Sequence, residues 1–177
     1  PVALAAGDSI LMPFADEESV VQTRFATASL ALLRAHFGHD LTAAIADAEE
    51  ALAKPIPADP AAFEQFVFLG GGWTVGLTGE AALKLREAAR AWSEAYPAME
   101  YRHGPIALAD EQTLVVAIAD IDAALLADVR ATGATVLDPE PEPLASLVLA
   151  HRLAIALAHA RGLDPDNPRN LTRSVVL

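Results

Sequence analysis

Three charged residues with helical spacing are the first group in this sequence that could do chemistry. Glu80, Lys84 and Glu87 lie at positions i, i+4 and i+7, so their side chains point the same way from one helix. Two carboxylates around an ammonium group could move a proton and stabilise an oxygen that becomes negatively charged. Glu–Lys pairs at this spacing are also common helix stabilisers, and Arg86 and Arg90 widen the group. The spacing alone therefore favours an ordinary solvated face.

Two loops offer further candidates. His103 precedes a Gly-Pro pair, which holds the imidazole on a loop where a general acid or base is easily presented. Gly70, Gly71 and Gly72 follow an apolar run, and ligands of open parallel sheets bind at the carboxyl ends of the strands. Their spacing is not that of a dinucleotide or P-loop fingerprint. The three glycines are thus equally consistent with a ligand loop and with a tight turn packed closely against a helix.

The other histidines do not suggest a metal site. They lie on or beside predicted helices, where we interpret them as packing or surface residues, at positions 36, 39, 151 and 159. No pair of them with acidic neighbours makes a convincing set of ligands, and no nucleophile elbow is present. We expect neither a metal nor a cofactor.

Composition narrows the class of protein. The 177 residues are 53% hydrophobic, which suits one globular domain or one and a half small ones. The absence of cysteine excludes disulfides, thiolate metal sites and a thiol nucleophile. A net charge of −12 disfavours nucleic acid and anionic membranes, although backbone amides could still bind a small anion. The longest apolar stretch, residues 144–160, is interrupted by polar residues and predicts a buried helix. With no signal peptide, we expect a cytoplasmic protein.

The elements fall on two sides of a proline-rich linker. Before it we expect a strand and two helices, at residues 9–14, 18–37 and 40–54. Three prolines mark residues 54–61 as the linker, so we divide the chain into residues 1–53 and 62–177. After it we expect alternating strands and helices, at residues 66–69, 73–96, 113–119, 122–131, 135–137 and 143–160. Continuous apolar strands between helices predict an α/β fold with a parallel sheet covered on both faces.

Several of these segments together resemble the sugar isomerase (SIS) domain family, in particular the isomerase domains of glucosamine-6-phosphate synthases. The segments are residues 68–72 (FLGGG), 80–87 (EAALKLRE), 93–96 (SEAY), 102–108 (RHGPIAL) and 164–174 (DPDNPRNLTRS). Order and spacing match without gaps over residues 70–105, and residues 17–24 (EESVVQTR) are similar to the end of the family's first half. The resemblance implies a three-layer, flavodoxin-like parallel sheet flanked by helices. It implies that the chain is the end of one SIS half, residues 1–53, and all of the next.

The resemblance also implies roles for the charged residues. Glu87 would be the base that moves a proton between C1 and C2 of an aldose or ketose phosphate. His103 would open the sugar ring, commonly from a neighbouring subunit, which implies a homodimer with a shared site. Lys84 would stabilise the charge on the oxygens, and Glu80 would hold the polar network.

Substrate-binding positions follow from the same resemblance. The backbone near Val20 would line the sugar, and the tail would fold over it with residues Asn170, Thr172 and Arg173. The glycine loop, residues Gly70, Gly71 and Gly72, would complete the site.

Three departures from the family pattern bear on these roles. Arg173 stands where the synthases have a lysine, and an arginine stays charged and cannot form a Schiff base. Gly71 replaces the arginine that is usual in the glycine loop. The family's Ser/Thr-rich phosphate loop is not in the sequence, which indicates a fragment, a record with missing residues, or lost phosphate binding. Without cysteine the chain has no glutaminase activity, so as a complete gene product it would be closer to relatives without the glutaminase domain.

Two functions remain open. The joint presence of Glu80, Lys84, Glu87 and His103 favours a phosphosugar isomerase or deaminase of amino-sugar metabolism. Arg173 favours a sugar-phosphate sensor or structural partner that binds without turnover. A module in which every polar group is merely solvated is the third interpretation.

Overall fold

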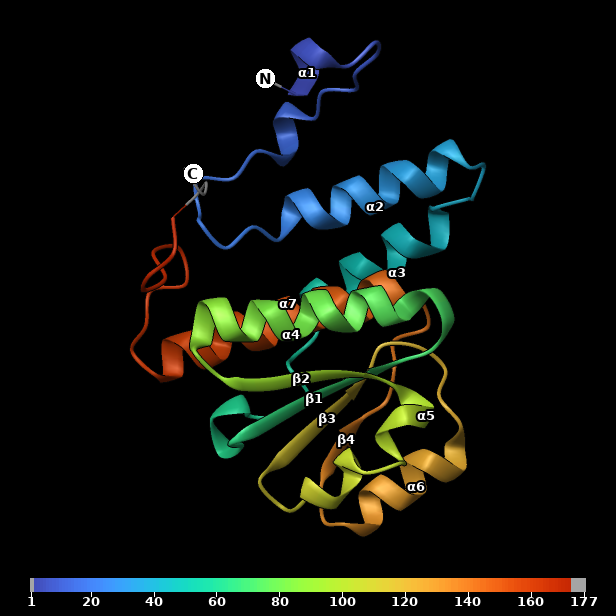
Figure 1. Ribbon diagram of the computed structural model, residues 1–177, viewed down its shortest axis with the longest axis vertical. Coiled ribbons are helices and arrows are strands. Elements are labelled where there is room, and N and C mark those ends of the chain that lie inside the picture. The colour runs from blue at the N-terminus through green and yellow to red at the C-terminus, as the bar shows by residue number, and fades with distance from the viewer. Residues whose placement is uncertain (1, 173–177) are drawn as a thin grey trace.

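The computed structural model describes residues 2–172 and has the predicted α/β architecture (Figure 1). Four parallel strands form one sheet in the order β2-β1-β3-β4. Their bounds are Gln65–Gly70 for β1, Trp92–Pro97 for β2, Thr113–Ala117 for β3 and Thr135–Leu137 for β4. The interior strands β1 and β3 are apolar almost throughout because helices cover both of their faces.

Helices lie on both faces of the sheet and complete three layers (Figure 1). One face is covered by α4 (Val75–Ala89) and α7 (Pro143–Ala160), and the other by α5 (Ala98–Tyr101) and α6 (Ala123–Ala131). Outside this body, α3 (Thr42–Ala53) packs on α7. The remaining helices are α1 (Val2–Ala5), α2 (Arg24–His36) and the 3-10 turns Pro13–Ala15, Pro60–Ala62, Gly72–Thr74 and Pro105–Leu108.

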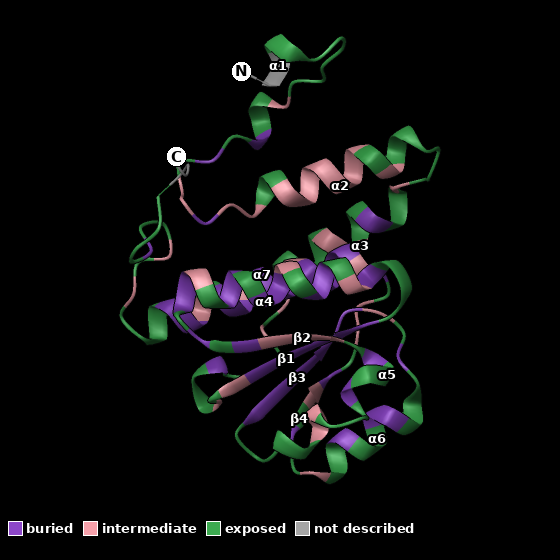
Figure 2. Cartoon of the chain, in the orientation of Figure 1, coloured by how far each residue is buried: buried purple, intermediate pink, exposed green. Residues whose placement is uncertain are grey.

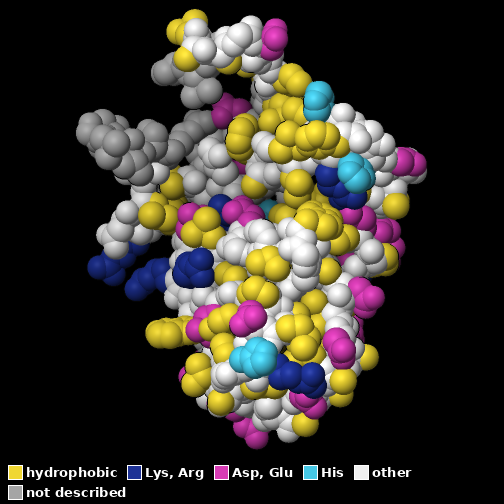
Figure 3. All heavy atoms as spheres, turned by 45° about the vertical axis from the view of Figure 1, so that its right-hand side comes forward, with side chains coloured by type: hydrophobic (Ala, Val, Ile, Leu, Met, Phe, Trp, Pro, Cys, Tyr) yellow, Lys and Arg dark blue, Asp and Glu magenta, His cyan; other side chains and the backbone are white. Residues whose placement is uncertain are grey.

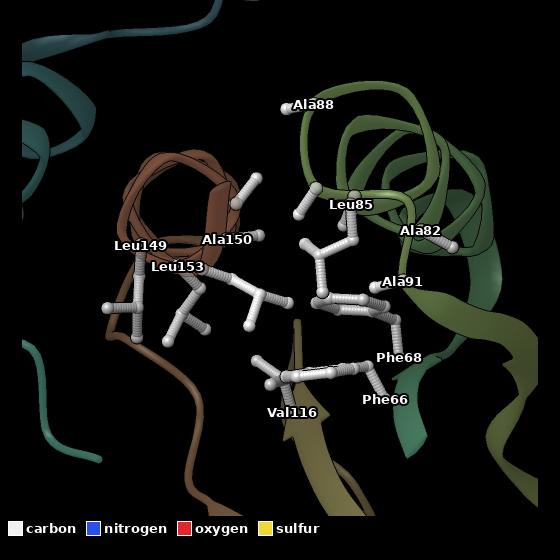
Figure 4. Packing of buried hydrophobic residues seen from close by; sticks show 14 of the residues in the cluster. Phe66, Phe68, Ala82, Leu85, Ala88, Ala91, Val116, Leu149, Ala150 and Leu153 are labelled. Atoms are coloured by element: carbon white, nitrogen blue, oxygen red, sulfur yellow. The ribbon is translucent and has the colours of Figure 1, made fainter. Parts of the chain in front are cut away.

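The core lies between the sheet and the α4–α7 pair. Phe66 and Phe68 of β1 point toward Leu85 of α4 and Leu153 of α7, as Figure 4 shows, and all four are fully buried. Alternate residues of the same strand, Val67 and Leu69, belong to a second apolar cluster that includes residues of α5 and α6. In Figure 2 the buried residues accordingly fill the interior strands β1 and β3 and the sheet-facing sides of the helices. This packing fixes α4 and α7 beside each other.

The prediction of one long helix that reaches about residue 96 is wrong at the C-terminal end of that helix. Helix α4 stops at Ala89, Arg90 adopts a left-handed conformation with φ of 53°, and residues 92–97 form the edge strand β2. Left-handed helix ends usually carry glycine, so an arginine there gives no sequence signal. The strand has a neighbour on one side only and is half exposed, so it lacks the continuous apolar run of β1 and β3.

The N-terminal predictions also needed correction. Residues 9–14 form no strand, and Ile10, Leu11 and Phe14 are exposed, because no strand in the described chain lies beside this segment to pair with it. The predicted helix at 18–37 starts only at Arg24. Figure 3 shows hydrophobic side chains gathered over the upper part of the molecule, where the N-terminal segment and α2 lie. Division of the chain into two halves at residues 54–61 stays a prediction.

Helix α3 before the linker, and β1 and the elements from β3 onward after it, were predicted to within about two residues. The short helix α5 was not predicted. By length and composition α7 could cross a membrane, but 61% of it is buried in this fold, which is how a core helix packs.

Candidate functional site

The three charged residues of α4 form one ion-paired cluster. Lys84 Nζ lies 2.9 Å from Glu87 Oε2 and 3.4 Å from Glu80 Oε1. The lysine side chain is 8% exposed and each glutamate side chain 23%. A buried ammonium group needs partners of opposite charge, which the two carboxylates supply. The interpretation of an ordinary solvated face therefore does not hold for Lys84.

Glu17, which the sequence reasoning missed, anchors the loop that faces this cluster. Its carboxylate accepts hydrogen bonds from the backbone amides of Thr23 and Phe25, each at 3.0 Å, and from the Thr23 hydroxyl at 3.1 Å. Burial acts to raise the pKa of Glu17, but the hydrogen bonds from Phe25, Arg24 and Thr23 outweigh it and lower the pKa below the ordinary 4.5. The group is thus ionised at neutral pH, and it fixes the start of α2.

His151 is a second residue that we did not expect at the site. It lies on α7, which packs against α4, and only 7% of it is exposed. Burial, followed by the positive charge of Lys84, lowers its pKa to about 4, although Glu17 acts in the opposite direction. The imidazole is neutral at pH 7. Helical periodicity could have found it, because Leu147 and Ala154 lie on the same buried face of α7.

A hollow of about 250 Å³ lies between α4, α7 and the loop of Glu17. Lys84, His151 and Glu17 all line it, and the rest of its wall comes from Ser19, Val21, Thr23, Ala88, Ala154, Ile155, His159, Pro165 and Asp166. Residues that are distant in sequence meet here because the packing of α7 on α4 brings residue 151 to residue 84.

Two neighbouring hollows share wall residues with the first. One of about 510 Å³ shares Glu17, Ser19 and Asp166 with it and is otherwise lined by Glu18, Arg24 and Asn167. The other, of about 130 Å³, shares Ala88 with the first and is otherwise lined by Glu87, Arg90 and residues 163, 164 and 167–169 of the tail. Lys84 and Glu87 therefore open onto adjoining spaces walled by the tail.

The loop near Val20 is tied to the same tail. The backbone amide of Val20 donates a hydrogen bond of 3.1 Å to the carbonyl of Asp166. Asn170 has a φ of 66°, and both it and Thr172 are exposed beyond the tail segment that walls the hollows. Arg173 lies outside the described residues. The structure thus brings the Val20 loop and the tail together, while contacts of these residues with a sugar stay predictions.

The glycine loop has a packing role at Gly70. A Cβ atom there would lie 2.8 Å from Thr78 Cγ2 and 2.9 Å from the Thr74 carbonyl, so only glycine fits without a shift. The amide of Gly71 donates to Thr74 Oγ1 at 3.0 Å, and Gly72 has a φ of 54°. None of the three glycines lines the three hollows described above. Their role in substrate binding stays a prediction.

His103 is not brought to the α4 cluster. It is exposed, follows α5, and does not line the three hollows described above. In Figure 1 the α5 region and the end of α4 that carries Glu87 lie at opposite ends of β2. A role for His103 with Glu87 thus requires a second subunit. Within residues 2–172, no group of three or more His, Asp or Glu side chains could hold a metal ion.

Comparison with known protein families gives no matching family model. Individual relatives do match. The chain is 36% identical to a glutamine–fructose-6-phosphate aminotransferase (isomerizing) of Thermosynechococcus vestitus, over 64% of this chain and 23% of that protein. It is 34% identical to the enzyme of the same name from Gloeobacter violaceus, over 75% of this chain and 27% of that protein. The chain thus spans about a quarter of the length of these relatives.

Solved structures share the fold over almost the whole chain. Glucosamine-6-phosphate deaminase from Thermotoga maritima superposes with a TM-score of 0.76 and 29% identity, covering 94% of this chain and 61% of that one. Tagatose-6-phosphate ketose/aldose isomerase from Escherichia coli has a TM-score of 0.77 with 19% identity, covering 99% and 59%, and supports the fold alone.

Proposed function

We propose that this chain, a member of the sugar isomerase (SIS) family by sequence and by fold, acts on a phosphosugar as an isomerase or deaminase. The chemistry would be a proton transfer between C1 and C2 of the substrate. The observation that supports it best is the buried Lys84 held between Glu80 and Glu87 at the edge of adjoining hollows. An ionic cluster of this kind costs desolvation free energy, so a helix that needed only stability would do as well with apolar residues.

Glu87 is the base in this mechanism. Its carboxylate would take a proton from the carbon next to the carbonyl, leaving an enediol or an enamine-like intermediate, and return the proton to the neighbouring carbon. Lys84, 2.9 Å from this carboxylate, would stabilise the negative charge that develops on the substrate oxygen. Glu80 Oε1 lies 3.4 Å from the same ammonium group, and this carboxylate would keep it in place.

The proposal extends to partners and location. A homodimer would let His103 of one subunit open the sugar ring bound beside Glu87 of the other. The net charge of −12 disfavours nucleic acid and anionic membranes as partners, and a phosphosugar substrate implies a cytoplasmic enzyme. Because the relatives are about four times longer than the matched part, the activity of a whole protein is part of this proposal.

A binding module without turnover is the second candidate. Arg173 stands where the resemblance places a lysine, and an arginine cannot form an imine with the substrate carbonyl. Proton transfer by Glu87 does not need that imine, so the two candidates differ in whether exchange at C1 and C2 occurs at all.

Replacement of the base tests the proposal. Glu87→Gln keeps the size of the side chain and should lower kcat with fructose 6-phosphate or glucosamine 6-phosphate at least ~100-fold. Binding of the same sugars, measured by titration calorimetry, should stay nearly unchanged. Glu49→Gln on the exposed face of α3 is the matched control and should behave like the wild type.

The outcomes separate the candidates. Unchanged turnover in Glu87→Gln would remove this residue from the mechanism. Binding without turnover in the wild-type chain would support the binding module, and neither binding nor turnover would contradict both proposals.

A further inference from the structure

The mechanism proposed above gives no function to two buried polar atoms that lack a hydrogen-bond partner among the described residues, Tyr101 Oη and His151 Nε2. Of these two residues only His151 lines one of the three hollows. The Nε2 atom of His151 is buried and has no hydrogen-bond partner among the described residues. A buried polar group without a partner costs about 1–3 kcal/mol, so such groups in native structures usually meet water or a ligand. His151 belongs to the wall of the 250 Å³ hollow, so a molecule bound there lies next to the imidazole that carries this atom.

The groups around the hollow indicate what that partner is. Glu17 and Asp166 bring carboxylates to it, and the one buried ammonium group in its wall, Lys84, is already paired with two glutamates. This balance of charge disfavours a phosphate group. Ser19 and Thr23 add hydroxyl groups, and His159 adds a second imidazole at the rim. A neutral, hydroxylated molecule suits this lining best.

A hydroxyl group also matches the imidazole. Burial keeps His151 neutral, and a neutral imidazole has one nitrogen that donates and one that accepts. A hydroxyl both donates and accepts, so it can pair with Nε2 in either tautomer. The hollow is smaller than the pockets that hold drug-sized ligands, and it has room for a short hydroxylated carbon chain.

We propose that His151 binds a hydroxyl group of the sugar substrate through Nε2, with the polyhydroxy part of the sugar entering between α4 and α7 beside Lys84. This inference rests on the proposed function, since it assigns a second contact to the same substrate. His151 thereby becomes a specificity residue. A site that hydrogen-bonds a substrate hydroxyl discriminates against an analogue without it, because the protein group is then left unpaired.

Two variants of the full chain test the assignment. His151→Leu replaces the hydrogen-bonding group with an apolar side chain. His151→Gln retains a neutral group that can both donate and accept a hydrogen bond. His36→Leu, on the exposed end of α2, is the matched histidine control. Thermal unfolding of each variant verifies that it folds. The probes are fructose 6-phosphate and its monodeoxy analogues, and the readout is the Kd from titration calorimetry.

The expected result is a pattern across probes. His151→Leu should bind fructose 6-phosphate about two- to tenfold more weakly, the range for loss of one hydrogen bond. It should bind one deoxy analogue as tightly as the wild type does, and His151→Gln should recover most of the lost affinity. A purely structural role would weaken all probes equally, which a hydrogen bond to one hydroxyl would not.

Each of the other outcomes would overturn the inference about His151. Equal affinities of wild type and His151→Leu for every probe would overturn the inference and leave the proposed function standing. A uniform loss across all probes would also overturn it. If the wild-type chain binds none of the phosphosugars, the proposed function fails, and the role of His151 fails with it.

Discussion

Lowering the pH from 7 to 5 should destabilise the folded chain through His151. Burial lowers the pKa of this imidazole to about 4 from the ordinary 6.5. Between these two values the unfolded chain binds a proton that the folded chain does not bind. The free energy of unfolding therefore falls as the pH falls through this window, with a slope of about 1.4 kcal/mol per pH unit. From pH 6.5 to 5 the loss amounts to about 2 kcal/mol.

The charged groups that face His151 determine the pH range in which the experiment should be done. Lys84 opposes protonation of the imidazole and Glu17 favours it. Hydrogen bonds lower the pKa of Glu17 below 4.5, so the stability that this carboxylate contributes is lost only at more acidic pH than the range used here. Measurements at pH 7, 6.5 and 5 thus isolate the contribution of His151.

Urea unfolding of the wild type and of His151→Gln tests whether His151 causes this loss of stability, because glutamine does not titrate. The difference in unfolding free energy between the two should change by about 2 kcal/mol between pH 6.5 and pH 5, at the expense of the wild type. His36→Gln removes an exposed histidine and should follow the wild type. Parallel pH profiles for wild type and His151→Gln would refute the conclusion that His151 is buried in its neutral form.

Three further predictions test other parts of the structure. Gly70→Ala should cost about 1–3 kcal/mol in urea unfolding, because its Cβ would meet a side-chain methyl at 2.8 Å, whereas Gly71→Ala has nothing within 4 Å and should cost much less. Asp122→Ala removes the side chain that caps α6 and should cost about 1 kcal/mol in the same assay. Inactive Glu87→Gln and His103→Ala chains should partly restore turnover when mixed as dimers, and no restored turnover would argue for a site within one subunit.

Much of the fold could be predicted because its interior strands and main helices carry strong patterns. The strands β1 and β3 are continuously apolar because they are buried on both faces of the sheet. Helix α7 is apolar because it packs between other helices and is largely buried. Strand β2 was missed because an edge strand is only partly buried and because α4 ends at an arginine in the left-handed region. The apolar residues 9–14 form no strand because a strand needs a neighbour, which a local pattern cannot show.

The candidate site was predictable only in part, for a related reason. Spacing put Glu80, Lys84 and Glu87 on one helix face, but whether that face is solvated depends on what packs over it. Burial of Lys84 follows from α7 and the loop of Glu17, which are distant in sequence. His151 likewise becomes a candidate site residue only because α7 packs on α4, which places it in one hollow with Lys84. The local sequence around residue 151 does not indicate which helix will pack against it.

Proton exchange is the most direct test of the central claim that this chain transfers a proton between C1 and C2 of a phosphosugar. The full chain is incubated in deuterium oxide with fructose 6-phosphate or with glucosamine 6-phosphate, and deuterium at C1 and C2 is followed by NMR. The account predicts incorporation by the wild type and at least ~100-fold slower incorporation by Glu87→Gln. No incorporation by a wild-type chain that binds these sugars would contradict the proposed chemistry.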